Sequence, residues 1–189
     1  MKLFFSAIAA AIALPGLANA TVINIDFATT NSGGYTGFGA AENTAGNTTW
    51  NTASYAAGSG GSITLSDLVD SANGATSVDF SLNGLQGSQN PAGQMERSGG
   101  YSGLMRDYVR VDAGTVAGTV ATGNGSFSGL VVGASYDLYF YGQGENFNAG
   151  ASLLRGQNTL FTVNGLSQQT SWDGNALGDG LLAEGVEYV

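Results

Sequence analysis

Short stretches in which apolar and polar residues alternate are the main pattern of this chain. In "TVINIDF" the side chains predicted to point inward are Ile23, Ile25 and Phe27, and those predicted to point outward are Val22, Asn24 and Asp26. In "TSVDFSLNG" the predicted inward side chains are Val78, Phe80 and Leu82. Because successive side chains of a strand point to opposite faces, both patterns predict half-buried strands.

Further strands are predicted downstream. "YVRVDAGTVAGTVATG" reads as one or two strands carrying Val109, Val111, Val116 and Val120, and "GSFSGL" as a short strand around Phe127. "TLFTVNGLSQQTSW" predicts a hairpin, because Asn164-Gly165 suits the positive φ angles of a type I′ turn. The stretch "ITLSDLVDS" has two possible interpretations, a short helix and a strand followed by a turn. About seven short strands with glycine-rich loops predict an all-β fold, an antiparallel β-sandwich or jelly roll.

Four aromatic side chains are concentrated within six positions of "GLVVGASYDLYFYGQGE". Alternation places Tyr136, Leu138 and Phe140 on one face, which we expect to build the core. Tyr139 and Tyr141 point the other way, either under a covering loop or along a ligand surface. The spacing of "LVVGASY" resembles a tyrosine corner, in which the tyrosine hydroxyl bonds to upstream backbone.

The first 20 residues have the three-part layout of a cleavable signal peptide. Lys2 precedes an apolar run, Pro15-Gly16 ends it, and Ala18-Asn19-Ala20 is a small-x-small cleavage site. The run is about half the length of a membrane span, which needs about 20 residues. We therefore expect residues 1–20 to be a signal peptide, residues 21–189 to form a single domain, and the chain to have no further membrane span.

Charge and composition exclude several functions. Without Lys2 the only cations are four arginines, against 14 acidic residues, so the chain is not expected to bind nucleic acid or anionic membranes. The chain has no cysteine and no histidine. Disulfides are therefore absent, and so are serine–histidine and zinc hydrolase mechanisms of the usual kind.

The phrases "INIDF", "GGYTGFGAAENTAGNTTWN", "GLVVGASYDLYFYGQGE" and "FTVNG", following a signal peptide, resemble exported bacterial proteins of the exosortase-sorted (PEP-CTERM) class. This resemblance implies a malectin-like or galactose-binding-like β-sandwich at the cell surface. Members of that class end in a Pro-Glu-Pro motif, an apolar helix and an arginine cluster. This chain ends at "LLAEGVEYV", so either it is a fragment or the resemblance covers only the globular part.

A long loop, residues 33–55, is the candidate ligand site. Its ligand-binding candidates are Tyr35, Phe38, Glu42 and Trp50. Sugars stack on aromatic faces while carboxylates and amides bind their hydroxyls, so this composition suits an extracellular polysaccharide. The alternative is that Trp50 caps the core. A loop of this length is usually functional or disordered, and its aromatic residues favour an ordered loop with a ring near the surface.

A second candidate site is a calcium loop in "DGNALGDGLLAE". The residues considered as metal ligands are Asp173, Asn175, Asp179 and Glu184. Asp173, Asn175, Gly178 and Glu184 match positions 1, 3, 6 and 12 of an EF-hand loop. Leu177 at position 5 cannot supply a side-chain oxygen, and no flanking helices are predicted, so calcium is the only cofactor considered and the match is partial.

The function predicted from the sequence is that of a secreted or cell-surface β-sandwich module without catalytic activity, which binds glycan. The alternatives are a purely structural surface protein and a glycan-active hydrolase that uses two carboxylates. No motif selects two of the 14 acidic residues for catalysis.

Overall fold

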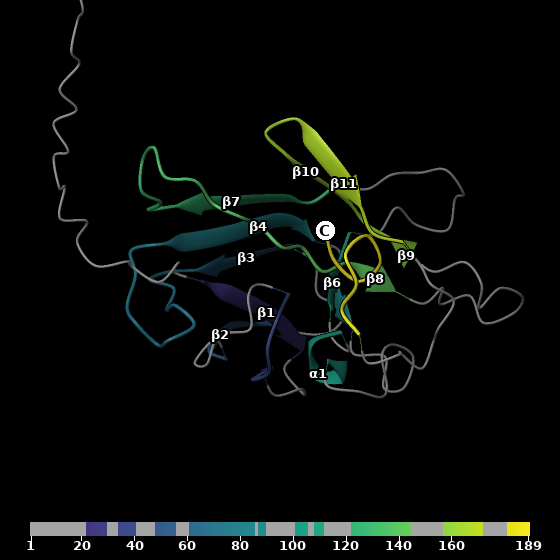
Figure 1. Ribbon diagram of the computed structural model, residues 1–189, viewed down its shortest axis with the longest axis horizontal. Helices are drawn as coiled ribbons and strands as arrows, with labels where there is room; N and C mark the ends of the chain where they lie inside the picture. The colour runs from purple at the N-terminus through teal and green to yellow at the C-terminus, as the bar shows by residue number, and fades with distance from the viewer. Residues whose placement is uncertain are drawn as a thin grey trace, which may run out of the picture.

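Short β-strands dominate the structure. A computed structural model of the protein describes residues 22–29, 34–40, 48–55, 61–85, 87–89, 101–105, 108–111, 122–144, 157–171 and 181–189. The strands are β1 (Asn24–Thr29), β2 (Trp50–Tyr55), β3 (Gly61–Leu65), β4 (Asp79–Leu85), β5 (Gly87–Gln89), β6 (Tyr108–Arg110), β7 (Asn124–Ser128), β8 (Gln143–Gly144), β9 (Gln157–Asn158), β10 (Leu160–Val163) and β11 (Leu166–Gln169). A single helical turn, α1 (Ser102–Met105), lies between β5 and β6 (Figure 1). The predicted all-β class is confirmed for this part of the chain, in which no helix is long and apolar enough to cross a membrane.

An antiparallel sheet in the order β3-β4-β7 forms the centre of the fold (Figure 1). In register, Phe80 lies opposite both Leu65 and Phe127. The strands predicted around Val78–Leu82 and around Phe127 are therefore confirmed. The "ITLSDLVDS" stretch is the end of β3 followed by a turn, not a helix, because Asp70 Oδ1 accepts the backbone N–H of Gly74 at 2.6 Å and closes that turn.

Two apolar clusters fill the inner side of this sheet. Ala53, Ile63 and Leu85 form one cluster, and Leu68, Val78 and Phe80 form the other. Phe27, Leu65 and Leu82 pack against both clusters. Burying each large apolar side chain stabilises the fold by about 1.5–3 kcal/mol. The predicted inward positions of "TSVDFSLNG" are thus confirmed as core or partly buried positions.

The pairing of β1 with β2 differs from the antiparallel arrangement predicted from the sequence. The two strands run parallel, with Asn24 opposite Trp50 and Thr29 opposite Tyr55. A parallel pair cannot be joined by a tight hairpin turn, which explains the long connection between them. Alternation has the same period in both kinds of pair, so it could not show the strand direction.

Strand β1 is covered on both faces, whereas the sequence predicted that one face meets solvent. Asn24 is 7% exposed and Asp26 is 3% exposed. The Asn24 side chain donates to the Thr49 carbonyl at 3.0 Å, and Asp26 Oδ2 accepts the Tyr35 N–H at 2.9 Å. The outward prediction for these two residues is wrong because residues 34–40 and the start of β2 cover them. Their polar atoms are buried with hydrogen-bond partners, as burial requires.

The stretch from Tyr136 to Tyr141 is not the core strand predicted from its alternation. Tyr136 and Leu138 are 46% and 41% exposed, and Phe140 is half-buried. The described residues place no second layer over Tyr136 and Leu138, so the expectation that they build the core is wrong. The tyrosine-corner bond itself is present, since the Val131 N–H donates to the Tyr136 hydroxyl at 2.8 Å.

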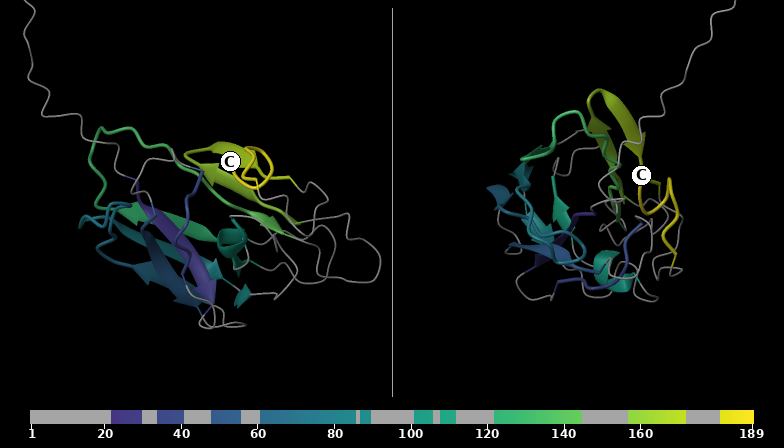
Figure 2. Two further views of the ribbon diagram at one scale, coloured as in Figure 1. Left: turned by 60° about the horizontal axis from the view of Figure 1, so that its bottom comes forward. Right: turned by 60° about the vertical axis from the view of Figure 1, so that its left-hand side comes forward.

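The β10–β11 hairpin confirms the predicted turn. Asn164 and Gly165 have φ angles of 50° and 81°, as a type I′ turn requires. Across the pair, the Thr162 and Ser167 hydroxyls are 2.7 Å apart. Figures 1 and 2 show the hairpin standing apart from the β3-β4-β7 sheet, with the C-terminus near its base.

Several predictions fall outside the described residues. They are the signal peptide of residues 1–20, the strand positions Val116 and Val120, the ligand candidate Glu42, and the metal candidates Asp173, Asn175 and Asp179. Within the described part of the same predicted strand region, Val109 lies in β6 and packs against the Ala53 cluster, while Val111 is 37% exposed.

Candidate functional site

Five aromatic rings from four segments of the chain form a continuous series, which we call the aromatic row. In order of contact its members are Tyr35, Trp50, Tyr141, Tyr188 and Tyr139. Consecutive ring centroids are 5.1, 6.4, 6.2 and 6.0 Å apart. These are the distances of favourable aromatic pairs, so the row joins residues 34–40, the start of β2, residues 139–141 and the C-terminal segment.

Trp50 lies at the first position of β2 and not in a loop, as its sequence neighbourhood had suggested. Its Nε1 donates to the Gly37 carbonyl at 2.8 Å, and the Tyr35 ring meets it edge-on. The Tyr35 hydroxyl in turn donates to the Phe38 carbonyl at 3.1 Å. These bonds hold residues 34–40 over the indole. The indole N–H therefore has its hydrogen-bond partner within the protein.

The Tyr141 ring also packs against the indole. Its hydroxyl accepts the Ala40 N–H at 2.6 Å, and burial raises the pKa of Tyr141 to about 12. The phenol therefore stays protonated at neutral pH. Gly39 allows this approach, because a Cβ on it would lie 2.6 Å from the Tyr141 hydroxyl.

The structure thus brings together three of the four predicted ligand-binding residues. Tyr35, Phe38 and Trp50 are neighbours, all half-buried, and Glu42 lies outside the described residues. The ring contact between Tyr35 and Trp50 and the bond from the Trp50 indole to the Gly37 carbonyl support the packing interpretation of Trp50 over a free sugar platform. Tyr139 and Tyr141 were predicted to lie either under a covering loop or along a ligand surface, and the structure separates them. Tyr141 lies under residues 39–40, while Tyr139 is 40% exposed.

Tyr188 completes the row and was not selected from the sequence. A short apolar segment near the end of a chain carries no periodic signal that would place its ring. The backbone places it: Tyr188 forms a bridge with Tyr141, and Phe140 and Val189 exchange two backbone bonds of 2.8 and 3.0 Å. Tyrosines in the two segments are therefore held side by side.

Of the four metal-ligand candidates in the proposed calcium loop, one, Glu184, lies within the described residues. Glu184 is exposed, and its backbone forms a bridge with Tyr188. Among the described residues no three acidic side chains lie together as a metal site would need. The other three metal candidates are outside this part of the chain, so the calcium loop stays a prediction.

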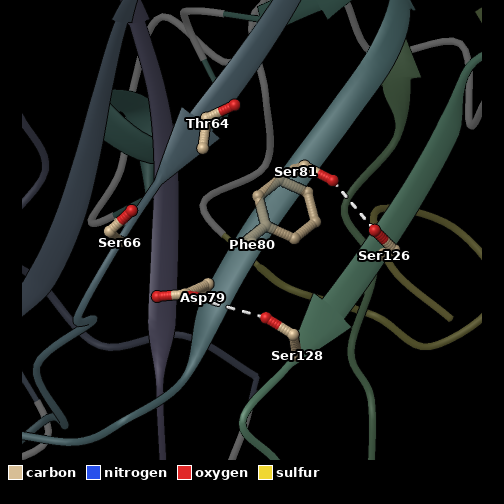
Figure 3. Close-up of a pocket in the computed structure, with 7 residues that line it drawn as sticks. All are labelled: Thr64, Ser66, Asp79, Phe80, Ser81, Ser126 and Ser128. Carbon is tan, nitrogen blue, oxygen red and sulfur yellow. Dashed lines mark hydrogen bonds between the residues drawn. The ribbon is translucent and has the colours of Figure 1, made fainter.

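A shallow hollow lies on the outer face of the β3-β4-β7 sheet (Figure 3). Its volume is about 190 Å³. Its lining residues are Thr64, Ser66, Asp79, Phe80, Ser81, Ser126 and Ser128. Since the Phe80 ring packs against Phe27 and Phe127 in the core, the outer surface offered here consists of five hydroxyl side chains and one carboxylate.

Hydrogen bonds fix the polar groups of the hollow in place. The Ser81 and Ser126 hydroxyls are 2.8 Å apart, and the Ser128 hydroxyl donates to Asp79 Oδ2 at 3.2 Å (Figure 3). The other carboxylate oxygen of Asp79 accepts the Asp67 N–H at 2.9 Å. Each hydroxyl can donate once and accept twice, so capacity remains for a polar ligand.

This outer face was not chosen as a site from the sequence. The available signal was the polar half of two alternating strands: Asp79 and Ser81 in one, and Ser126 and Ser128 in the other. Serine on an outward position is ordinary, and only the register of β4 with β7 brings the four side chains together.

Comparisons of the chain with protein-family models, with curated proteins and with solved structures find no match.

Proposed function

We propose that the protein is a secreted or cell-surface β-sandwich module without catalytic activity, which binds polysaccharide in the hydroxyl-lined hollow of the β3-β4-β7 sheet. The observation that carries this proposal is the set of five hydroxyls and the Asp79 carboxylate around one hollow. Sugars present many hydroxyls that both donate and accept, so a surface of the same chemistry, with one fixed carboxylate, suits them. The second layer of the sandwich, the cleaved leader and the exosortase-sorted class belong to the same proposal.

The size of the hollow suits a short contact with a chain of sugars. Pockets for drug-sized ligands measure about 300–1,000 Å³. A volume of about 190 Å³ in an open surface therefore accommodates the edge of one sugar unit, with the rest of the polymer outside. Such a site binds weakly alone, and a polymer offers many copies of its unit.

The single carboxylate of the hollow favours binding over hydrolysis. Glycoside hydrolysis by the usual route needs two carboxyl groups flanking the scissile bond. Asp79 is the single carboxylate among the lining residues. A hydrolase would have to assemble its pair elsewhere in the chain.

The competing proposal is a purely structural surface protein. The aromatic row favours it, because the polar atoms of Tyr35, Trp50 and Tyr141 are bonded inside the protein. A structural protein and a glycan-binding module differ in one measurable property, which is saturable binding that depends on the hollow.

The test is a glycan array with the folded protein, followed by titration of any bound polysaccharide. We expect Asp79→Asn to weaken binding about tenfold or more, because a hydrogen bond to a charged group contributes about 1.5–3 kcal/mol. Ser126→Ala should weaken it less. The matched control is Ser167→Ala, which removes a hydroxyl from the similar Thr162–Ser167 pair on the hairpin and should leave binding unchanged.

Two results would contradict the proposal. If no glycan binds, the purely structural protein is favoured. If a glycan binds equally well to the Asp79→Asn and Ser126→Ala variants, the ligand site lies outside the hollow, and release of reducing sugar would point to the hydrolase.

A further inference from the structure

Tyr139 and Tyr188 lie side by side at the exposed end of the aromatic row. Their ring centroids are 6.0 Å apart, with an angle of 50° between the rings. Tyr139 is 40% exposed and Tyr188 is half-buried. The contact joins two segments that are far apart in the sequence, and the paired backbones of Phe140 and Val189 hold these segments in register.

We propose that this pair is a site of oxidative modification, at which a peroxide-dependent one-electron oxidant joins Tyr139 to Tyr188 by a carbon–carbon bond. The inference is independent of glycan binding, since it uses a different part of the molecule. The reagent class is a haem peroxidase with hydrogen peroxide, acting from solvent on the exposed Tyr139 ring.

The reaction balances as follows. Each phenol loses one electron and its hydroxyl proton, which gives two tyrosyl radicals. The radicals couple between one Cε carbon of each ring, ortho to the oxygen, and the hydrogen on each of those carbons moves to oxygen and restores both phenols. The protein loses two hydrogen atoms in total, and hydrogen peroxide takes up the two electrons and two protons to give two molecules of water.

The surroundings of Tyr188 keep its phenol protonated. Partial burial, then the nearby Glu184 carboxylate and the Tyr139 ring, raise the pKa of Tyr188. The phenol is therefore neutral when it is oxidised. Its proton therefore leaves together with the electron.

The neighbouring tyrosines Tyr141 and Tyr136 are less well placed. The Tyr141 ring is 6.2 Å from that of Tyr188, but it is covered by residues 39–40, and its hydroxyl is bonded to the Ala40 N–H. Tyr136 is slightly more exposed than Tyr139, at 46% against 40%, but within the described part of the chain its ring contacts no other tyrosine. Proximity and exposure coincide at Tyr139 and Tyr188.

The bond would serve this chain as a covalent staple. The protein has no cysteine and so cannot form a disulfide. A link between residues 139 and 188 would close a long loop and reduce the conformational freedom of the unfolded chain, as a disulfide does. The cross-linked protein should therefore have a higher Tm than the untreated protein.

The experiment treats the full-length folded protein, at low concentration, with peroxidase and hydrogen peroxide. We expect blue dityrosine fluorescence, a monomer whose mass is lower by two hydrogen atoms, and a cross-linked peptide that contains Tyr139 and Tyr188. Tyr139→Phe and Tyr188→Phe should each abolish this peptide. The matched control, Tyr136→Phe, removes a comparably exposed phenol from the same segment and should keep it.

Several outcomes would overturn the proposal. These are a cross-link that survives Tyr139→Phe, a product that joins other tyrosines, a product found only between two molecules, or no dityrosine at all. Thermal unfolding of each variant before oxidation checks that it is folded. Tyr139→Phe is the decisive variant, because it removes a hydroxyl from an exposed ring and keeps the ring itself.

Discussion

The β3-β4-β7 sheet and the β10–β11 hairpin are built by the same local rules and end in different environments. Both are antiparallel, and both carry a cross-strand hydroxyl pair, Ser81–Ser126 in the sheet and Thr162–Ser167 in the hairpin. In the sheet, Phe80 is 8% exposed. In the hairpin, Leu166 is 79% exposed.

The difference comes from what lies against each pair of strands. The inner side of the sheet is covered by β1 and by the segment that carries Leu68 and Val78. The hairpin is attached mainly at its base, where Phe161 stacks on Phe140 and the buried Thr170 bonds to Gly142 and Thr159. Pairing is thus decided locally, whereas burial depends on a second layer supplied by distant residues.

The largest loss of stability is expected from a substitution in the core of the sheet. Phe80→Ala should lower the free energy of unfolding by about 3–5 kcal/mol, because it leaves a cavity between Phe27 and Phe127. Leu166→Ala on the hairpin should change it by less than about 0.5 kcal/mol. Urea unfolding of both variants measures the contrast, and equal losses would show that the hairpin is buried in solution.

A smaller loss of stability is expected when either of two glycines with similar backbone conformations is replaced by alanine. Gly129 and Gly165 have φ angles of 72° and 81°. A side chain at either position costs about 1–2 kcal/mol in this left-handed conformation. At Gly129 a Cβ would also overlap the Ser77 carbonyl oxygen, whereas at Gly165 it would meet nothing within 4 Å.

Gly129→Ala should therefore lower the Tm more than Gly165→Ala does. Thermal unfolding of the two variants measures the difference. A larger loss for Gly165→Ala would contradict the open surroundings of the hairpin turn.

The smallest effect is expected from a substitution that weakens the attachment of the β10–β11 hairpin. Phe161→Ala removes the stack on Phe140, in which the centroids are 4.9 Å apart and the planes differ by 17°. Such a pair contributes about 0.5–1.5 kcal/mol beyond its burial. We expect amide hydrogen exchange to become faster in β10 and β11 and to stay unchanged in β4, since the hairpin opens separately. Faster exchange in both would show that the two regions unfold together.

Local features of the fold were predictable from the sequence, whereas its long-range features were not. Asn164-Gly165 specified the hairpin turn, and the alternation around Phe80 specified a buried strand, because both depend on neighbouring residues. The burial of Asp26 and the exposure of Tyr136 could not be predicted in this way. The burial of Asp26 depends on residues 34–40 lying over β1. Tyr136 is exposed because no described segment packs over it.

The candidate sites show the same division. Tyr35 and Trp50 could be selected because they stand close together in a sequence rich in polar residues. Their partner Tyr141 is about a hundred residues away, and Tyr188 is further still. The hollow around Asp79 depends on β7 lying in register with β4, and no short stretch of sequence contains that information.

The hydrogen bond between Ala40 and Tyr141 also bears on how the chain assembles. It links residues 101 positions apart, whereas β3 and β4 pair within residues 61–85. Contacts between distant residues require large loops to close and slow the rate of folding. The β3–β4 pair needs only a short loop to close, whereas the aromatic row needs residues 35, 50, 141 and 188 to come together, so we expect the row to form after this pair.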